Sequence, residues 1–121
     1  MMSEVKIAII SLLKEICPNV YNGKSSVIYP KINLWIKLID DSTFRSRYAV
    51  VLDLYTKGGE TDDVEVMAES VEKLLTMSKA KIEGGYLAAY KSGGGGLAEY
   101  KDSEKIFHYV DNYEVIFYKE E

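Results

Sequence analysis

The chain has 121 residues, of which 47% are hydrophobic and 28% charged, a balance typical of a folded globular protein rather than a disordered one. A net charge of −4 leaves no basic surplus for sequence-independent binding of nucleic acid. No apolar run approaches the ~18 residues of a membrane span, and the N-terminus, with Glu4 and Lys6, lacks the cleavage site of a signal peptide. We therefore expect a single soluble domain over residues 1–121, located in the cytoplasm where it is made, with no membrane partner.

Residues 3–17 have the spacing of an amphipathic helix. Its apolar positions recur every three or four residues: Val5, Ala8, Ile9, Leu12, Leu13 and Ile16. Pro18 cannot continue a helix and marks its end. Cys17 is the single cysteine, so no intrachain disulfide can form, and we expect a buried, unreactive thiol. The wide apolar stripe predicts burial against a sheet, or partly against another subunit.

Two alternating segments follow and predict an antiparallel hairpin over residues 31–39 and 46–56. One face of the hairpin is apolar and should form the core: Ile32, Leu34, Ile36, Leu38, Tyr48, Val50, Leu52 and Leu54. The opposite face, which we term the back face, is also mostly apolar: Trp35, Ile39, Ala49, Val51, Asp53 and Tyr55. A sheet with one face in water alternates more cleanly than this. Either the first helix covers the back face, or the back face is an exposed patch that binds a partner, and we predict it as a subunit interface.

The second helix is predicted over residues 62–78. Asp62 stands at its N-cap with Glu65 three residues later, which is the capping-box spacing. Its apolar stripe recurs every three or four residues: Val64, Met67, Ala68, Val71, Leu74 and Leu75. Residues 85–91 and 105–119 then predict a second pair of strands. The expected fold is α+β, an antiparallel sheet of about four strands with two helices in the order α-β-β-α-β-β.

Two loops are candidates for contact with a partner. The loop between the first two strands is polar except for Phe44, an aromatic side chain that must either fold back on the domain or touch a partner. The second loop, residues 92–96, is Ser-Gly-Gly-Gly-Gly and lacks the Lys-Ser/Thr pair and the following helix of a phosphate-binding loop, so we expect it to order on assembly. The residues predicted to contact partners are Asp40, Asp41, Phe44, Arg45, Gly93, Gly94, Gly95 and Gly96.

No catalytic or metal-binding constellation is recognisable in the sequence. One histidine and one cysteine cannot make a zinc site by themselves, and the acidic pairs lack the spacing of a calcium loop. Asp53 and Asp111 are the only acids deep inside strands, and for Asp53 we expect a surface ion pair or an inter-subunit contact. His108 falls at a strand position that we expect to be exposed. The sequence thus predicts no enzyme, no catalytic residue, no metal and no cofactor.

The strand Tyr-Ala-Val-Val-Leu-Asp-Leu-Tyr at 48–55 feeds a helix at 64–75, and the pair Phe107-His108 leads into a long final strand at 109–117. This order of helix, connector, hairpin, helix and hairpin resembles the tail-terminator (tail completion) proteins of long-tailed bacteriophages. The likeness spans nearly the whole chain. The loop at residues 92–96, which we term the glycine loop, is longer and richer in glycine than this family pattern leads us to expect.

The resemblance implies a structural role without catalysis. Such proteins form a hexameric ring on the finished tail tube, stop its polymerisation and join it to the DNA-filled head. The implied partners are further copies of the chain, the tail tube protein and a head connector protein; DNA would pass through the ring without specific binding, which an acidic balance favours. The implied location is the head–tail junction of the virion, after assembly in the host cytoplasm. The alternatives are a head-completion or minor tail protein, and a small cytoplasmic ligand-binding or regulatory domain.

Overall fold

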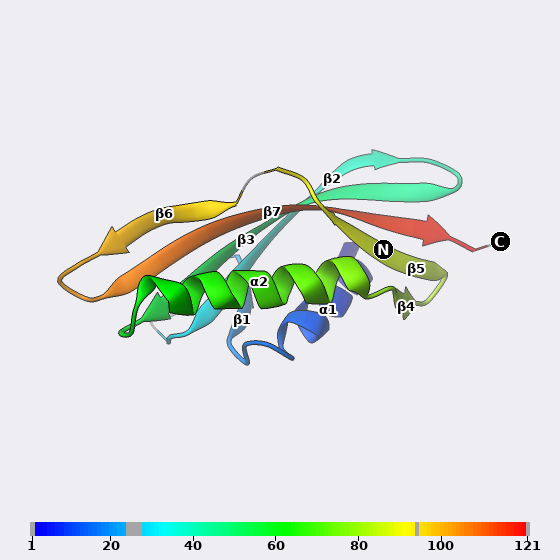
Figure 1. Ribbon diagram of the computed structural model, residues 1–121. Coiled ribbons are helices and arrows are strands. Elements are labelled where there is room, and N and C mark those ends of the chain that lie inside the picture. Colours follow the sequence, from blue (N-terminus) through cyan, green and yellow to red (C-terminus); the bar gives the residue numbers. More distant parts are fainter. Residues whose placement is uncertain (1, 24–27, 94, 121) are drawn as a thin grey trace.

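The computed structural model describes residues 2–23, 28–93 and 95–120. These residues form helices α1 (Met2–Leu13) and α2 (Thr61–Met77) and seven strands of one sheet. The strands are β1 (Val20–Asn22), β2 (Lys31–Asp41), β3 (Arg45–Lys57), β4 (Ala80–Ile82), β5 (Gly85–Lys91), β6 (Gly96–Lys101) and β7 (Ile106–Lys119). Figure 1 shows a strongly twisted sheet with both helices on the same side. None of the described helices is long and apolar enough to cross a membrane.

The long strand β7 organises the sheet, whose strand order is β1-β2-β3-β7-β5-β4. Its 14 residues pair with β3 along one side and with both β5 and β6 along the other. β2 and β3 form an antiparallel hairpin in which Ile32 lies opposite Leu54. The predicted pairings, of the first long strand with the second and of the third with the last, are therefore confirmed.

The predicted fold class is nevertheless wrong. The sheet has seven strands rather than the four expected, and it is mixed, because β1 runs parallel to β2. The missed strands carry little alternation: β1 and β4 have 3 residues each, and every residue of β6 is exposed. Such short segments become strands because they pair with the open edges of longer neighbours. Gly96, which we expected in a loop, is the first residue of β6.

The core lies between the sheet and the two helices. On β3, the predicted core row is exposed by no more than 2% at each position: Tyr48, Val50, Leu52 and Leu54. The same cluster contains side chains from both helices, namely Val5, Ile9 and Leu13 of α1 and Val64, Val71 and Leu75 of α2. Helix α1 therefore covers the same face as α2 (Figure 1), and the back face carries no helix.

Helix α2 begins at Thr61, one residue earlier than predicted, and ends at Met77. Asp63, rather than Asp62, closes its first turn, because the Asp63 Oδ2 atom accepts a 3.0 Å hydrogen bond from the backbone N–H of Glu60. An acid at this position also interacts favourably with the positive end of the helix dipole. This cap fixes the turn that leads from β3 into the helix.

Candidate interaction surfaces

The back face of the sheet brings together most of the residues that the sequence predicts as an interface. The register places Trp35 of β2 opposite Val51 of β3. The side chain of Trp35 is 44% exposed, and four further residues are half-buried: Ala49, Val51, Asp53 and Tyr55. Neither described helix covers these side chains. The face is thus accessible, but polar groups interrupt its apolar area.

Asp53 lies on this face, and contacts within its own chain hold its side chain in place. Its Oδ2 atom accepts a 2.7 Å hydrogen bond from the indole N–H of Trp35, and its Oδ1 atom lies 2.8 Å from Nε2 of His108. The ring of Tyr55 stacks on the His108 ring with the centroids 4.3 Å apart. His108 is therefore half-buried in a network rather than exposed as predicted. The sequence does not reveal this contact, because it depends on the register between β3 and β7.

A cation between two tyrosine rings continues the back face towards the start of β2. The Nζ atom of Lys31 lies 4.7 Å from the ring centroid of Tyr29 and 4.8 Å from that of Tyr55. Burial lowers the pKa of Lys31, and burial together with the nearby charge of Asp53 raises the pKa of Tyr55. Cation–π contact and ring packing thus order this end of the face.

The tip of the β2–β3 hairpin is shorter and tighter than predicted. Asp40 and Asp41 belong to β2 and Arg45 begins β3, so the connecting loop contains only residues 42–44. Ile39 lies at a bulge between Leu38 and Asp40, where the register of the hairpin shifts. Phe44 is 70% exposed, so it does not fold back on the domain.

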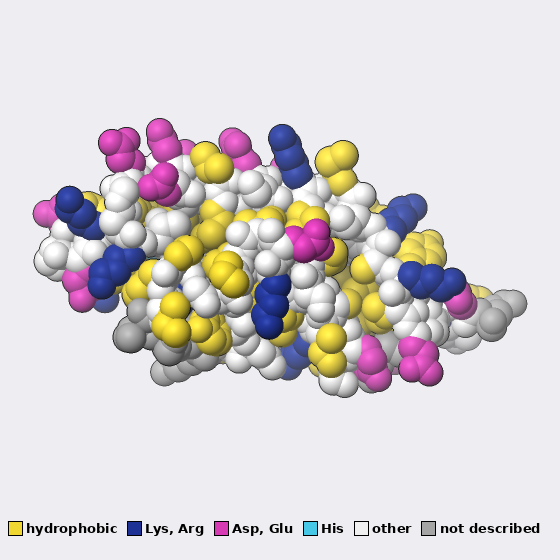
Figure 2. Space-filling view, turned by 90° about the horizontal axis from the view of Figure 1, so that it is seen from below, with side chains coloured by type: hydrophobic (Ala, Val, Ile, Leu, Met, Phe, Trp, Pro, Cys, Tyr) yellow, Lys and Arg dark blue, Asp and Glu magenta, His cyan; other side chains and the backbone are white. Residues whose placement is uncertain are grey.

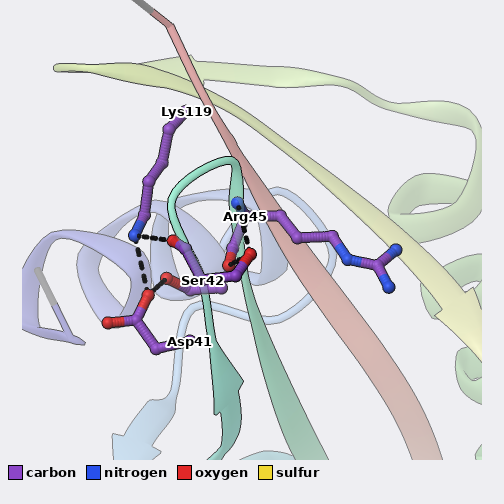
Figure 3. Close-up of polar contacts among 5 residues, drawn as sticks. Asp41, Ser42, Arg45 and Lys119 are labelled. Atoms are coloured by element: carbon purple, nitrogen blue, oxygen red, sulfur yellow. Dashed lines mark hydrogen bonds and ion pairs between the residues drawn. The ribbon is translucent and has the colours of Figure 1, made fainter.

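Lys119, near the end of β7, anchors this tip (Figure 3). Its Nζ atom lies 2.7 Å from Oδ1 of Asp41 and donates a 2.5 Å hydrogen bond to the carbonyl oxygen of Ser42. The same Asp41 oxygen accepts a 2.6 Å hydrogen bond from the hydroxyl of Ser46. The contact with Lys119, followed by that with Ser46, lowers the pKa of Asp41. The guanidinium of Arg45 points away from this cluster (Figure 3).

A buried acid lies on the opposite, helix-covered side of the sheet. Asp111 is 0% exposed, its Oδ1 atom lies 2.8 Å from Nζ of Lys91, and its Oδ2 atom accepts a 2.9 Å hydrogen bond from the hydroxyl of Tyr113. Lys91 also lies 3.0 Å from a carboxylate oxygen of Glu72 on α2. Burial alone would lower the pKa of Lys91, but the bonds to Asp111 and Glu72 raise it. The network links side chains of β5, β7 and α2, so we assign it a structural role.

Gly95 of the glycine loop lies close to this acid. A Cβ atom on Gly95 would lie 2.8 Å from Oδ1 of Asp111, so a side chain there would collide with the buried network. Gly93 has a φ of 138°, in the region that favours glycine. Gly94 lies outside the described residues. Close approach to Asp111 is therefore one physical reason for glycine in this loop.

No group of three or more His, Cys, Asp or Glu side chains in the described part of the chain is placed to hold a metal ion. Cys17 is buried, and burial raises the pKa of its thiol. A thiol with a raised pKa carries little of the reactive thiolate form. This position of Cys17 agrees with the packing role expected from the sequence.

Comparison with known proteins identifies a similar fold but no family. No protein-family model matches the chain, and no curated protein matches it. Among solved structures, a chain from the virion of a native gene transfer agent (GTA) particle has a similar fold, with a TM-score of 0.73. The match covers 97% of this chain and 96% of that chain at 11% sequence identity. At this identity the likeness shows a shared fold over the full length of both chains.

Proposed function

We propose that this chain is a structural protein of a phage or phage-like virion and that it acts as a tail terminator, without catalysis or a cofactor. The observation that carries the proposal is the fold shared over 97% of the chain with a protein of a gene transfer agent virion. The resemblance of the sequence to tail terminators supports the finer role. In this role the chain forms a ring that caps the tail tube, stops its polymerisation and joins it to the head.

The surfaces of the molecule support an assembly role. A closed ring needs two different patches on each subunit, which meet head to tail. We propose the back face as part of one patch, with the contact residues Trp35, Ile39, Ala49, Val51, Asp53 and Tyr55. The glycine loop and the acids near the hairpin tip, Asp40 and Asp41, are proposed to face the tube or the connector. The net charge of −4 favours passage of DNA through the ring without adhesion.

Binding of the purified chain to tail tubes and to head connectors tests this proposal. The purified chain is added to tail tubes and, separately, to head connectors, and bound protein is imaged by negative-stain electron microscopy. A terminator binds as a ring at the tube end and prevents further growth. Binding to connectors alone would instead identify a head-completion protein, and binding to neither would contradict the proposed role.

A further inference from the structure

A groove of about 420 Å³ lies between α1 and β4. Its apolar lining comes from both elements: Ile7, Ala8, Leu12, Ala80 and Ile82. Its charged lining is mostly acidic: Glu4, Glu15 and Glu83, with Lys81, whose Nζ atom lies 3.8 Å from a carboxylate oxygen of Glu120. Figure 2 looks onto the helical side and shows hydrophobic side chains gathered between acidic and basic ones. The groove therefore suits an apolar side chain that is followed by a positive charge.

The β2–β3 hairpin tip has this complementary character. Phe44 is 70% exposed, and Leu38 and Ile39 are also exposed. The acids of the tip are already paired with cations of the same chain, Asp41 with Lys119 at 2.7 Å and Asp40 with Arg47 at 3.8 Å. Arg45, by contrast, makes no ion pair with a described residue, and its guanidinium points away from the Asp41–Lys119 cluster (Figure 3). The tip thus presents an apolar ring beside a positive charge.

We propose that the hairpin tip of one copy docks in the α1–β4 groove of a neighbouring copy. Phe44 lies against the apolar lining, and Arg45 faces Glu15 and Glu83. Burial of the ring supplies affinity, and the opposite charges fix the orientation of the two copies. This inference rests on the proposed ring, for which it names the contact between subunits.

The topology of the sheet allows this contact to repeat around a ring. The groove and the hairpin tip are two different surfaces of one chain, built on β4 and on the β2–β3 hairpin. Both lie near the end of β7, where Arg45 is opposite Tyr118 and Gly85 is opposite Lys119. A contact between two different patches is head to tail and closes into a ring when the rotation permits. Among the described strands, β4 pairs only with β5, and β1 covers β2 only from Ile32 to Leu34. Both partners therefore also offer open backbone edges that can extend a sheet from one copy to the next.

Cross-linking between two single-cysteine-addition variants tests the docking directly. Thr43→Cys places a thiol beside Phe44, and Ser11→Cys places one in the groove, while the native Cys17 stays buried. The two variants are mixed and treated with a short bismaleimide linker. A cross-linked dimer is expected in the mixture, and neither variant alone should form one. Met77→Cys, exposed on α2 outside the groove, replaces Ser11→Cys in the control mixture and should give no product.

A charge exchange provides the second measurement. Arg45→Glu should weaken self-association by about tenfold, and mixing it with the double variant Glu15→Lys and Glu83→Lys should restore much of the loss, because the charges are then reversed on both sides. Arg45→Lys is the matched control and should associate nearly as the native chain does. Light scattering measures the association, and circular dichroism confirms that each variant is folded.

The outcomes separate this contact from the proposed function. Rings that form without the specific cross-link, or that tolerate Arg45→Glu, overturn the docking and leave the terminator role intact. A specific cross-link in a protein that does not cap tubes supports the docking and overturns the terminator role. A chain that shows no self-association at any concentration, with or without tubes, overturns the docking.

Discussion

The side chains on the two sides of strand β3 are held by different interactions. On the helix-covered side, Leu52 is completely buried among apolar side chains. On the back face, the next residue, Asp53, binds the Trp35 indole and His108, and its side chain remains 18% exposed. The first side excludes water by packing, whereas the second is ordered by hydrogen bonds and ring stacking that tolerate water. Apolar content alone therefore does not distinguish a core face from a contact face.

The largest expected effect on the free energy of unfolding comes from truncating a core side chain on the helix-covered side. Leu52→Ala leaves a cavity in the core and should lower the free energy of unfolding by about 2–5 kcal/mol. Val51→Ala, on the open side of the same strand, should cost less than about 1.5 kcal/mol because its surroundings are half exposed. Denaturant unfolding measures both variants. Equal losses would show that the back face is packed as tightly as the core.

The two strand acids provide a second comparison between the sides. Asp111→Ala leaves the Tyr113 hydroxyl and the Lys91 ammonium without their buried partner and should cost about 1–3 kcal/mol. Asp53→Ala should cost less than about 1 kcal/mol, because water can reach the partly exposed groups that it leaves. The same unfolding measurement applies. A larger loss for Asp53→Ala would reverse the roles that we assign to the two acids.

Alkaline pH should weaken the covered side. Burial, together with the charge of Asp111, raises the pKa of Tyr113, and the pKa of Lys91 is raised by its bonds to Asp111 and Glu72. Both groups hold their protons more tightly in the folded state, so the unfolded state loses them first. The free energy of unfolding should therefore be level below about pH 9 and fall as the pH rises through about 10.

Tyr113→Phe should make this alkaline decline shallower, because the substitution removes one of the groups that hold their protons more tightly in the folded state. Tyr21→Phe, at a half-buried side chain of β1 away from this network, is the matched control and should retain the native decline. Unfolding curves recorded between pH 8 and pH 11 compare the three proteins. An unchanged decline in Tyr113→Phe would assign the pH dependence to other groups.

The smallest effect on folding is expected on the back face, where association should respond instead. Trp35→Ala and Val51→Asp should each lower the free energy of unfolding by only about 1 kcal/mol but disrupt self-association. Trp35 is the single tryptophan, so its fluorescence emission should shift to shorter wavelength when the native chain assembles. Normal assembly of either variant would exclude the back face as an interface.

The long elements of this fold follow from sequence periodicity, since the core row of β3 and the apolar stripe of α2 have unambiguous spacing. The short strands do not, because 3 residues in β1 or β4 contain too little alternation. The side of the sheet that α1 covers also could not be predicted. Its apolar stripe is compatible with either face until the rest of the sheet is in place.

The candidate surfaces were only partly predictable for a similar reason. Alternation groups Trp35, Val51 and Asp53 on one face, but it does not pair Asp53 with His108, which is 55 positions away. That contact depends on the register between β3 and β7. The groove could not be foreseen either, because it forms where α1 meets β4, a strand that the sequence pattern does not reveal.

The growth of tail tubes in the presence of the purified chain tests the central proposal most directly. Tube subunits are polymerised with and without the protein, and the lengths and ends of the tubes are recorded by electron microscopy. The proposed function predicts closed rings at the tube ends and tubes that stop growing once capped. Tubes that continue to grow, with ends free of bound protein at saturating concentration, would contradict it.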